Sequence, residues 1–504
     1  MIESTQVPAL LIVVPILAAT IPLAVGLRYE NAGWSIATVV TGALLLLTSW
    51  IAVGVYSGDG AVVHHLGGFT PPIGIELVAD RFSIAIALLI ASVSLVTLAY
   101  TRVGGPRGNT FYAGYLLLVG GLMGVTLTGD AFNLFVFLEI TGIATYALVA
   151  RGRGGGAAVA AMKYLILGTL GASLYLIGVG FLYLSTGTLN MVHLGESLAV
   201  VGYDEPLVRA GFAFIVVGFA IKVAQWPVHT WQPDAYQRAP DGVTPLIAAL
   251  VSTVSAYALG RVLYTVFTPD FLLNTPFASE LLVAIGTASI IAGSVLAVIQ
   301  WNLKRMLAYS SVSQFGLIVA AYGLVTETAL LGAIIHLLGH GIMKAGLFIG
   351  VGIIAATLGI RTIEEYGGLA RKRPYLAGSI ALLGIALVGI PPSIGFIGKW
   401  YIAVGAVEAA LWPVATVIFF STMLTLAYVA KLGERMYVQS DTGVSHTVRA
   451  TPLLTDGGEM LARPASLAMR AALVIVAVAA IVLGFAGAGF DAAFGPFVEE
   501  VFAQ

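Results

Sequence analysis

The 504-residue chain contains no cysteine. Disulfide bonds, thiolate-held zinc and iron–sulfur clusters are therefore excluded. Charge is scarce as well: Asp, Glu, Lys and Arg make up 10% of the residues, and 59% are hydrophobic. A typical soluble domain is about 25% charged, and several apolar runs here reach the ~20 residues that span a bilayer. The composition predicts an all-α, multi-pass membrane protein in contact with the lipid bilayer.

Motifs for bound cofactors are also lacking. Neither a GxxxxGK[ST] phosphate loop nor a dinucleotide-binding glycine fingerprint occurs, and the glycine run at 152–156 matches neither pattern. No nucleophile constellation and no basic nucleic-acid patch is found. We therefore expect no cofactor, no metal, no nucleic-acid partner and no activity as a stand-alone enzyme.

Apolar runs between turn signals predict about fourteen transmembrane helices in a single transmembrane domain covering 1–504. They are expected at 7–27, 33–56, 83–100, 112–128, 131–150, 160–184, 207–230, 244–268, 279–300, 306–325, 328–358, 375–406, 409–430 and 471–490. The first three helices occupy 1–110, and a loop and the last helix occupy 431–504. The first helix lacks a basic flank, so we interpret it as a membrane span and not a signal peptide.

The basic residues divide unequally between alternate loops. One set of loops holds 17 of the 24 Lys and Arg residues, whereas the opposite loops and both termini hold only Arg81 and Arg209. Cytoplasmic loops carry the excess of Lys and Arg. The pattern predicts that both termini lie outside, with the long 431–470 segment on the cytoplasmic side. It also supports the list of spans, because a missed helix would have mixed the two sets.

Lysine is the rarer basic residue, with 7 copies against 17 arginines, and four lysines fall inside expected spans: Lys163, Lys222, Lys344 and Lys399. An isolated charge inside the membrane costs at least ~2.5–3.5 kcal/mol. Lysine, unlike arginine, loses and regains its proton readily when buried. Four buried lysines therefore indicate proton transfer.

Glu139, near the middle of the 131–150 helix, is the acidic counterpart. A lone buried carboxyl would be protonated, and pairing with a buried lysine relieves both charges. Lys222 or Lys163 is the expected partner. The alternative is a static ion pair that holds two helices together.

His336, His340 and Lys344 are spaced four residues apart on the 328–358 helix. This spacing places them along one stripe. Three proton-exchanging groups in a stripe predict a relay. Metal binding by the two histidines is a weaker alternative, because no third ligand lies nearby in the sequence.

Two lysine-bearing helices contain helix breakers. Lys222 precedes Trp226-Pro227, and Lys399 follows Gly389-Ile390-Pro391-Pro392. Transporters use such breaks at corresponding positions of inverted repeats. We expect two inverted five-helix repeats, the fourth to eighth helices (111–268) and the ninth to thirteenth (279–430), with Lys222 and Lys399 in equivalent places. Alternatively, Pro and Gly are simply common in membrane helices.

Other polar residues receive structural interpretations. Arg261 is expected to extend towards the outer interface, and Asp130 to cap the 131–150 helix. Asp234 and Arg238 are expected to pair and fix the turn that contains them.

At these residues the sequence resembles the antiporter-like membrane subunits of Mrp-type cation/proton antiporters, respiratory complex I and membrane-bound hydrogenases. The matching segments are Gly74–Asp80, Gly129–Glu139, Lys163-Tyr164, Lys222–Ala235, Lys304–Ser311, His336–Lys344 and Gly389–Lys399. The first two of these, together with Thr186–Met191, are most similar to the D-type subunit of Mrp antiporters.

The resemblance implies that Glu139 and Lys222 form the ion pair of a first half-channel, that Lys399 is the exit-side lysine of a second, and that the histidine helix links them. One position departs from the family, because Thr253 stands where a lysine usually connects the half-channels. The relay is then either completed by water and the histidines or weakened. Asn302 replaces a usual aspartate.

The leading hypothesis is an ion-translocating subunit of a multisubunit antiporter in a prokaryotic cell membrane. It would exchange protons for a monovalent cation, with Na⁺ expected, and its partners would be the other subunits. The alternative is a proton-pumping membrane subunit of a complex I-like NADH:quinone oxidoreductase or a membrane-bound hydrogenase. A non-transporting scaffold is a third hypothesis.

Overall fold

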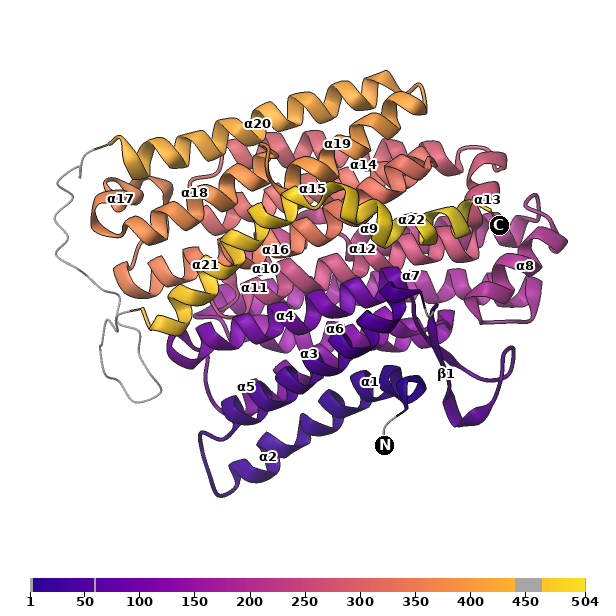
Figure 1. Ribbon diagram of the computed structural model, residues 1–504, viewed down its shortest axis with the longest axis horizontal. Coiled ribbons are helices and arrows are strands. Elements are labelled where there is room, and N and C mark those ends of the chain that lie inside the picture. Colours follow the sequence, from indigo (N-terminus) through magenta and orange to yellow (C-terminus); the bar gives the residue numbers. More distant parts are fainter. Residues whose placement is uncertain (1–2, 59, 440–464, 504) are drawn as a thin grey trace.

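The computed structural model describes residues 3–58, 60–439 and 465–503, which form a bundle of long helices (Figure 1). Twelve helices in these residues are long and apolar enough to cross a membrane. They are Ser4–Gly26 (η1, Ser4–Gln6; α1, Val7–Ala18; α2, Thr20–Gly26), α3 (Gly33–Ser57), α4 (Arg81–Gly104), α5 (Asn109–Leu127), α6 (Ala131–Ala150), α7 (Gly155–Thr186), Thr244–Val266, α14 (Ala278–Val298), α15 (Leu303–Leu324), α16 (Glu327–Leu358), α20 (Trp412–Tyr437) and Leu467–Phe485. The helical membrane fold is confirmed.

The two remaining expected spans are each divided into shorter helices. One consists of α9 (Pro206–Lys222) followed by η3 (Val228–Thr230) and α10 (Trp231–Arg238), and the other of α18 (Pro374–Val388) and α19 (Ile394–Glu408). Prolines cause both breaks because they cannot donate a backbone N–H. At the second break Gly389 has φ +88°, a conformation that glycine adopts without strain. The count of fourteen crossings and the inverted repeats stay predictions.

The span Thr244–Val266 is helical throughout but irregular. It consists of α11 (Thr244–Leu246), a π-helical turn (η4, Ile247–Val251), α12 (Ser252–Arg261) and a second π-helical turn (η5, Val262–Val266). π-turns inside α-helices are frequent at functional sites. The first one ends directly before Ser252 and Thr253.

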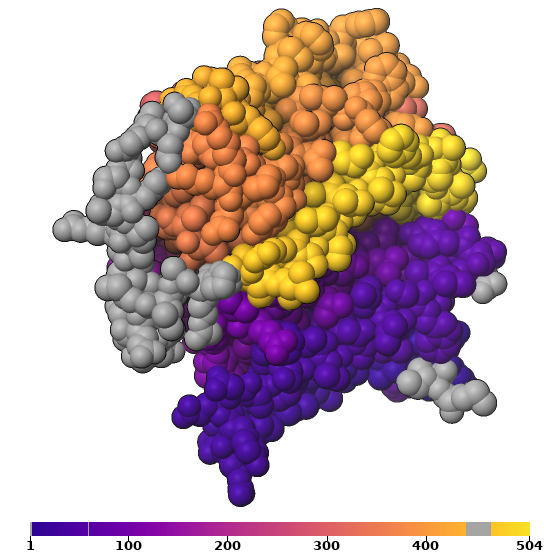
Figure 2. All heavy atoms as spheres, turned by 60° about the vertical axis from the view of Figure 1, so that its left-hand side comes forward, coloured from indigo at the N-terminus to yellow at the C-terminus, as the bar shows by residue number. Residues whose placement is uncertain are grey.

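Helix α16 lies at the centre of the bundle and is buried along most of its length. It packs against α4, α15, α18 and α19 and against the Thr244–Val266 span. Helix α21 (Leu467–Val482) and α22 (Gly487–Phe502) also cross it, in the seam between the N-terminal helices and α18–α20 (Figure 2). The last expected span, 471–490, corresponds to α21, which ends at Val482, and the separate helix α22 follows it.

Helix α1 begins and α22 ends at the same side of the bundle (Figure 1), as an even number of crossings requires. Most of the expected 431–470 loop, residues 440–464, lies outside the described residues.

Several smaller elements were not expected from the hydropathy pattern. They are the antiparallel strands β1 (Val62–His65) and β2 (Glu76–Ala79), the 3-10 turns η2 (Leu66–Gly68), η6 (Ile363–Tyr366) and η7 (Leu483–Phe485), and the short helices α8 (Met191–Val201), α13 (Thr268–Asn274) and α17 (Leu369–Lys372). Isolated bridges join Leu77 to Thr128 and Asp130 to Asn190. Three of the resembling segments therefore meet in space, and Asn190 Nδ2 donates to Glu76 at 2.7 Å.

Candidate ion-translocation site

The buried acid of α6 pairs with the lysine that ends α9. Lys222 Nζ lies 3.5 Å from Glu139 Oε1, and the two side chains are 8% and 23% exposed. Lys222 is the last residue of its helix, where the negative end of the helix dipole favours a cation. At the N-terminus of α6, Asp130 caps the helix by accepting from Asn133 N at 2.6 Å, as expected. The structure thus selects Lys222 as the partner of Glu139.

Lys163 takes a different partner. Its Nζ donates to Asp234 Oδ2 and to the Thr230 carbonyl, both at 2.8 Å. The second oxygen of Asp234 accepts from Arg305 at 2.7 Å. The expectation that Asp234 pairs with Arg238 is wrong, because Asp234 instead joins α7, α10 and α15. The expectation that Lys163 could pair with Glu139 is not met either.

Helices α10 and α12, which come after Lys222 in the chain, are joined by hydrogen bonds between buried polar side chains. Tyr236 Oη lies 2.9 Å from Ser252 Oγ, and Gln232 Nε2 donates to Tyr236 Oη at 3.1 Å. Thr253, which stands where the family usually has lysine, is fully buried. Its hydroxyl has no hydrogen-bond partner among the described residues.

The expected stripe on α16 faces a polar stripe on α15. His336 Nε2 lies 2.9 Å from Gln314 Oε1, and His340 Nε2 lies 3.3 Å from Ser311 Oγ. Lys344 Nζ donates to the Leu307 carbonyl at 2.8 Å, and also to Ser310 Oγ. Each α16 group is fully buried. Among the described residues, no three His, Asp or Glu side chains gather as they would around a metal ion.

Lys399 is held by the helix break itself. Its Nζ donates to the carbonyls of Leu387 and Val388, at 2.9 Å each. These carbonyls are freed at the end of α18, where the negative end of the helix dipole also favours a cation. Lys399 is 7% exposed, so the break provides a fixed acceptor pair for a buried lysine.

The two lysines do not occupy equivalent places, contrary to expectation. Lys222 lies before its break, at the end of α9, whereas Lys399 lies after its break, within α19. The sequence pattern paired a break with a lysine twice but did not distinguish the side of the break on which each lysine falls.

Close backbone contacts join the central helix to both neighbours. A Cβ atom at Gly398, directly before Lys399, would lie 2.7 Å from His336 Cα. A Cβ atom at Gly341 would lie 3.0 Å from the Ala249 carbonyl in the π-turn η4. Helix α16 therefore touches both the span that contains Thr253 and the helix that contains Lys399, so the stripe lies next to both.

Two further ion pairs were missed or misplaced by sequence reasoning. Arg261 is not extended to the interface as expected: it lies 2.6 Å from Asp80 Oδ2, and the side chains are 13% and 16% exposed. Arg261 also donates to Tyr257 Oη at 3.1 Å. Asp80 lies in the Gly74–Asp80 segment that resembles the family, and this was the one sequence signal that could have pointed to a role for Asp80 in an ion pair with Arg261.

Lys304, which the sequence assigned to a loop, is 4% exposed in the first turn of α15. It donates to Asp241 at 3.1 Å, and Arg361 donates to the other Asp241 oxygen at 3.1 Å. Burial acts to raise the pKa of Asp241, but the two cations hold it below its ordinary value. Asn302 caps α15, because its side chain accepts from Arg305 N at 3.1 Å.

Fold and site together define a multi-pass membrane protein with a row of buried ionisable side chains across two broken helices. The sequence profile described as "NADH:quinone oxidoreductase/Mrp antiporter, TM" matches residues 128–425. The chain belongs to this family.

Named relatives include both redox and antiporter subunits. The chain is 41% identical to NADH-quinone oxidoreductase subunit N of Desulforudis audaxviator, over 75% of each chain. It is 33% identical to the D-type subunit of a Na(+)/H(+) antiporter of Alkalihalophilus pseudofirmus, over 84% of this chain and 86% of that one. Among solved structures, a chain of the Mrp complex from Dietzia sp. DQ12-45-1b matches with a TM-score of 0.87 and 26% identity, covering 100% of both chains.

Proposed function

We propose that this protein is the ion-translocating subunit of a multisubunit antiporter that exchanges protons for a monovalent cation, Na⁺ in the first instance. The observation that carries the proposal is the buried row formed by Glu139–Lys222, the α16 stripe and Lys399. Intramembrane ionisable residues cost free energy to bury and characteristically mark ion pathways.

The Glu139–Lys222 pair acts as the first switch. When Glu139 takes up a proton it no longer attracts Lys222, and the charge of that lysine becomes available to its neighbours. One elementary charge crossing the membrane potential gains about 2.3 kcal/mol per 100 mV. The gradient can therefore drive the separation of an ion pair worth a few kcal/mol.

Water bridges the gap between Lys222 and α16 in this proposal. Several buried polar atoms in this region lack a protein partner among the described residues: Gln225 Oε1, His229 Nδ1, Gln232 Oε1, Thr253 Oγ1, His336 Nδ1 and His340 Nδ1. Buried polar atoms are normally hydrogen-bonded, and ordered water supplies the missing partners where protein does not. A hydroxyl at Thr253 orients such water but carries no charge, so water and the histidines replace the usual lysine.

Lys399 ends the row. Its two carbonyl acceptors hold the ammonium group, and none of the carboxylates in the described residues pairs with it. Its proton is therefore released when a second positive charge reaches the His336 side of α16. Lys163, tied to Asp234, positions α10 next to the first switch.

The relatives' names support other subunits as partners, because both describe subunits of larger assemblies. The distribution of basic loops supports an orientation with both termini outside. The bacterial relatives support a location in a prokaryotic cell membrane.

The proposal is tested with the complex reconstituted in vesicles. Replacing Glu139 or Lys222 with Ala should abolish Na⁺-driven proton movement while the complex still assembles. Glu280→Gln, an exposed acid on α14, is the matched control and should exchange normally. Normal exchange in the Glu139 or Lys222 variant would refute the proposal.

A second candidate function is supported by the 41% identity to an NADH-quinone oxidoreductase subunit. In that case the same row of residues would be driven by a redox reaction in partner subunits. Purification from the native membrane distinguishes the two: copurifying redox subunits favour the pump, and small antiporter subunits favour the exchanger.

A further inference from the structure

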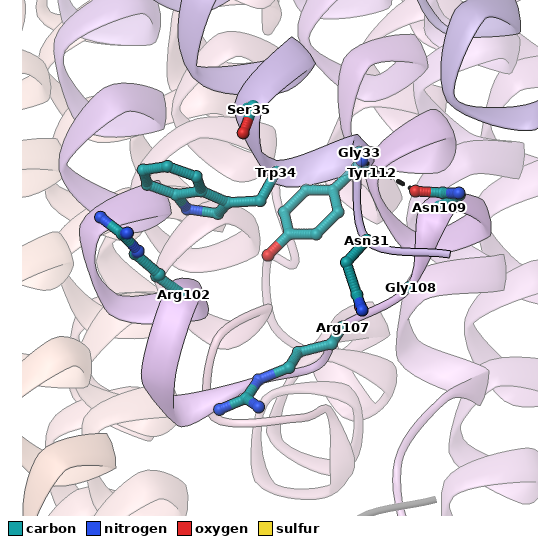
Figure 3. A pocket seen from close by; sticks show the side chains of 9 residues that line it. All are labelled: Asn31, Gly33, Trp34, Ser35, Arg102, Arg107, Gly108, Asn109 and Tyr112. Carbon is teal, nitrogen blue, oxygen red and sulfur yellow. Dashed lines mark hydrogen bonds between the residues drawn. The ribbon is translucent and has the colours of Figure 1, made fainter. Parts of the chain in front are cut away.

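A polar pocket lies outside the proposed ion path, where α3 begins and the α4–α5 connection ends. Its cavity volume is about 360 Å³, and Trp34, Arg102, Arg107, Asn109 and Tyr112 contribute side chains to its lining. In Figure 3 the Tyr112 hydroxyl points into the middle of this ring of residues, and Arg102 lies along the Trp34 indole. None of the carboxylates of the described residues lines the pocket.

The two arginines have unused hydrogen-bonding capacity. Among the described residues neither guanidinium lies within 4.0 Å of a carboxylate. Arg107 donates to the Val103 carbonyl at 2.7 Å, and both side chains are exposed. A guanidinium carries five N–H donors, so each of these arginines retains donors for an anion.

The rest of the pocket is held in place. Arg102 stacks on Trp34 at 4.4 Å, and the Trp34 Nε1 donates to the Leu98 carbonyl at 2.9 Å. Asn109 accepts from Gly33 N and donates to the Tyr29 carbonyl, at 2.8 Å each. The cation is therefore oriented before a ligand arrives, which lowers the ordering cost of binding.

The position of the pocket points to lipid as the source of the anion. It opens at the start of α3, a peripheral helix that presents an exposed apolar stripe of Val39, Leu46, Trp50 and Val53. Trp and Arg at the end of such a helix are typical of the membrane–water interface. The loops here also belong to the set predicted to face the cytoplasm, where anionic lipids attract basic residues.

We propose that this pocket binds the phosphodiester headgroup of an anionic phospholipid, with Arg102 and Arg107 as its cationic ligands. The acyl chains would lie along the apolar stripe of α3. A free phosphate ion offers the same anionic oxygens but has no acyl chains to contact the apolar stripe.

The test uses the chain purified with its accompanying subunits and reconstituted in phosphatidylcholine, with or without phosphatidylglycerol. Native mass spectrometry reports which lipid stays bound. We expect phosphatidylglycerol to be retained in preference to phosphatidylcholine. In the double variant Arg102→Gln/Arg107→Gln, the ratio of retained phosphatidylglycerol to phosphatidylcholine should fall about fivefold for each arginine removed. The matched control Arg153→Gln, an exposed arginine outside the pocket, should keep it.

A separate arm adds inorganic phosphate to the protein in phosphatidylcholine alone. Phosphate binding without any preference for phosphatidylglycerol would overturn the proposal, as would equal lipid retention by wild type and the double variant. If the double variant is not recovered, the single variant Arg107→Gln provides the same readout with an expected loss of about fivefold.

Discussion

The two halves of the bundle hold their buried lysines by different means. Lys222 faces a carboxylate, Glu139, at 3.5 Å. Lys399 faces two main-chain carbonyls at 2.9 Å. A carboxylate can take up a proton and release its partner, whereas a carbonyl cannot. The lysine of the first half is thus paired with a second titratable group, whereas the lysine of the second half is held by carbonyls that do not titrate.

Removing the acid of the first half should give the largest effect. Glu139→Gln leaves Lys222 buried and unpaired, and breaking a buried ion pair costs about 3 kcal/mol. We expect exchange in vesicles to be lost and the unfolding temperature in detergent to fall. The double variant Glu139→Gln/Lys222→Met should recover stability but not exchange. A double variant as unstable as the single one would contradict an ion pair in the first half.

Removing the lysine of the second half should cost less stability. Lys399→Met leaves only two carbonyls without a donor, about 1–3 kcal/mol, and no unpaired charge. Exchange should still be lost, because the row then lacks its end. Lys431→Met, which lies over Trp301 away from the row, is the control. Unchanged exchange in Lys399→Met would instead indicate a scaffold without a second half-channel.

Thr253 tests the junction between the halves. Thr253→Val keeps the shape and removes a hydroxyl that has no protein partner among the described residues. We expect stability to be unchanged or slightly higher, because no protein hydrogen bond is lost. Exchange should slow severalfold if this hydroxyl orients water. Ser255→Ala is the control, since the Ser255 hydroxyl already donates to the Val251 carbonyl. Equal rates in the two variants would remove Thr253 from the path.

The smallest effect on exchange is expected for the ion pairs of Asp241, which lie beside the row and act on stability. The pKa of Asp241 is held below its ordinary value in the folded protein. Its carboxylate therefore stabilises the fold fully above the ordinary pKa of about 3.9, and this contribution is lost as the pH falls through the folded-state pKa. Asp241→Asn should be about 2 kcal/mol less stable than wild type at pH 7, with the difference shrinking in acid. Unfolding temperatures measured against pH check this, with the exposed Asp204→Asn as control.

Sequence patterns predicted the membrane class, most span boundaries and the burial of Lys222, Lys344 and Lys399. Lys163, expected to be buried with them, has a side chain that is 36% exposed. Apolar runs of span length have few alternative structures in a bilayer, and Pro227, Pro391 and Pro392 forbid a continuous helix. The stripe of His336, His340 and Lys344 follows from helical geometry alone. These features are local, so the chain itself encodes them.

The sequence indicated which ionisable residues are important better than it indicated which of them pair with one another. Lys163 and Arg305 both bind Asp234, and Arg261 binds Asp80, although each pair is separated by tens of residues or more in the chain. Lys304 was assigned to a loop because its sequence neighbours are polar, whereas Asp241 and the Ala239 carbonyl bury it. The hairpin of β1 and β2 was missed because its strands have four residues each.

The sequence by itself determined that this is a membrane protein of the NADH:quinone oxidoreductase/Mrp antiporter family with a few costly charges inside the bilayer. Composition, helix period and helix breakers act on neighbouring residues and can be read along the chain. Only the tertiary structure decided that Glu139 meets Lys222, that carbonyls hold Lys399, and that Arg102 and Arg107 share a pocket. Such pairings depend on how helices distant in the sequence pack, and short-range electrostatic contacts exist only once that packing brings the charges together.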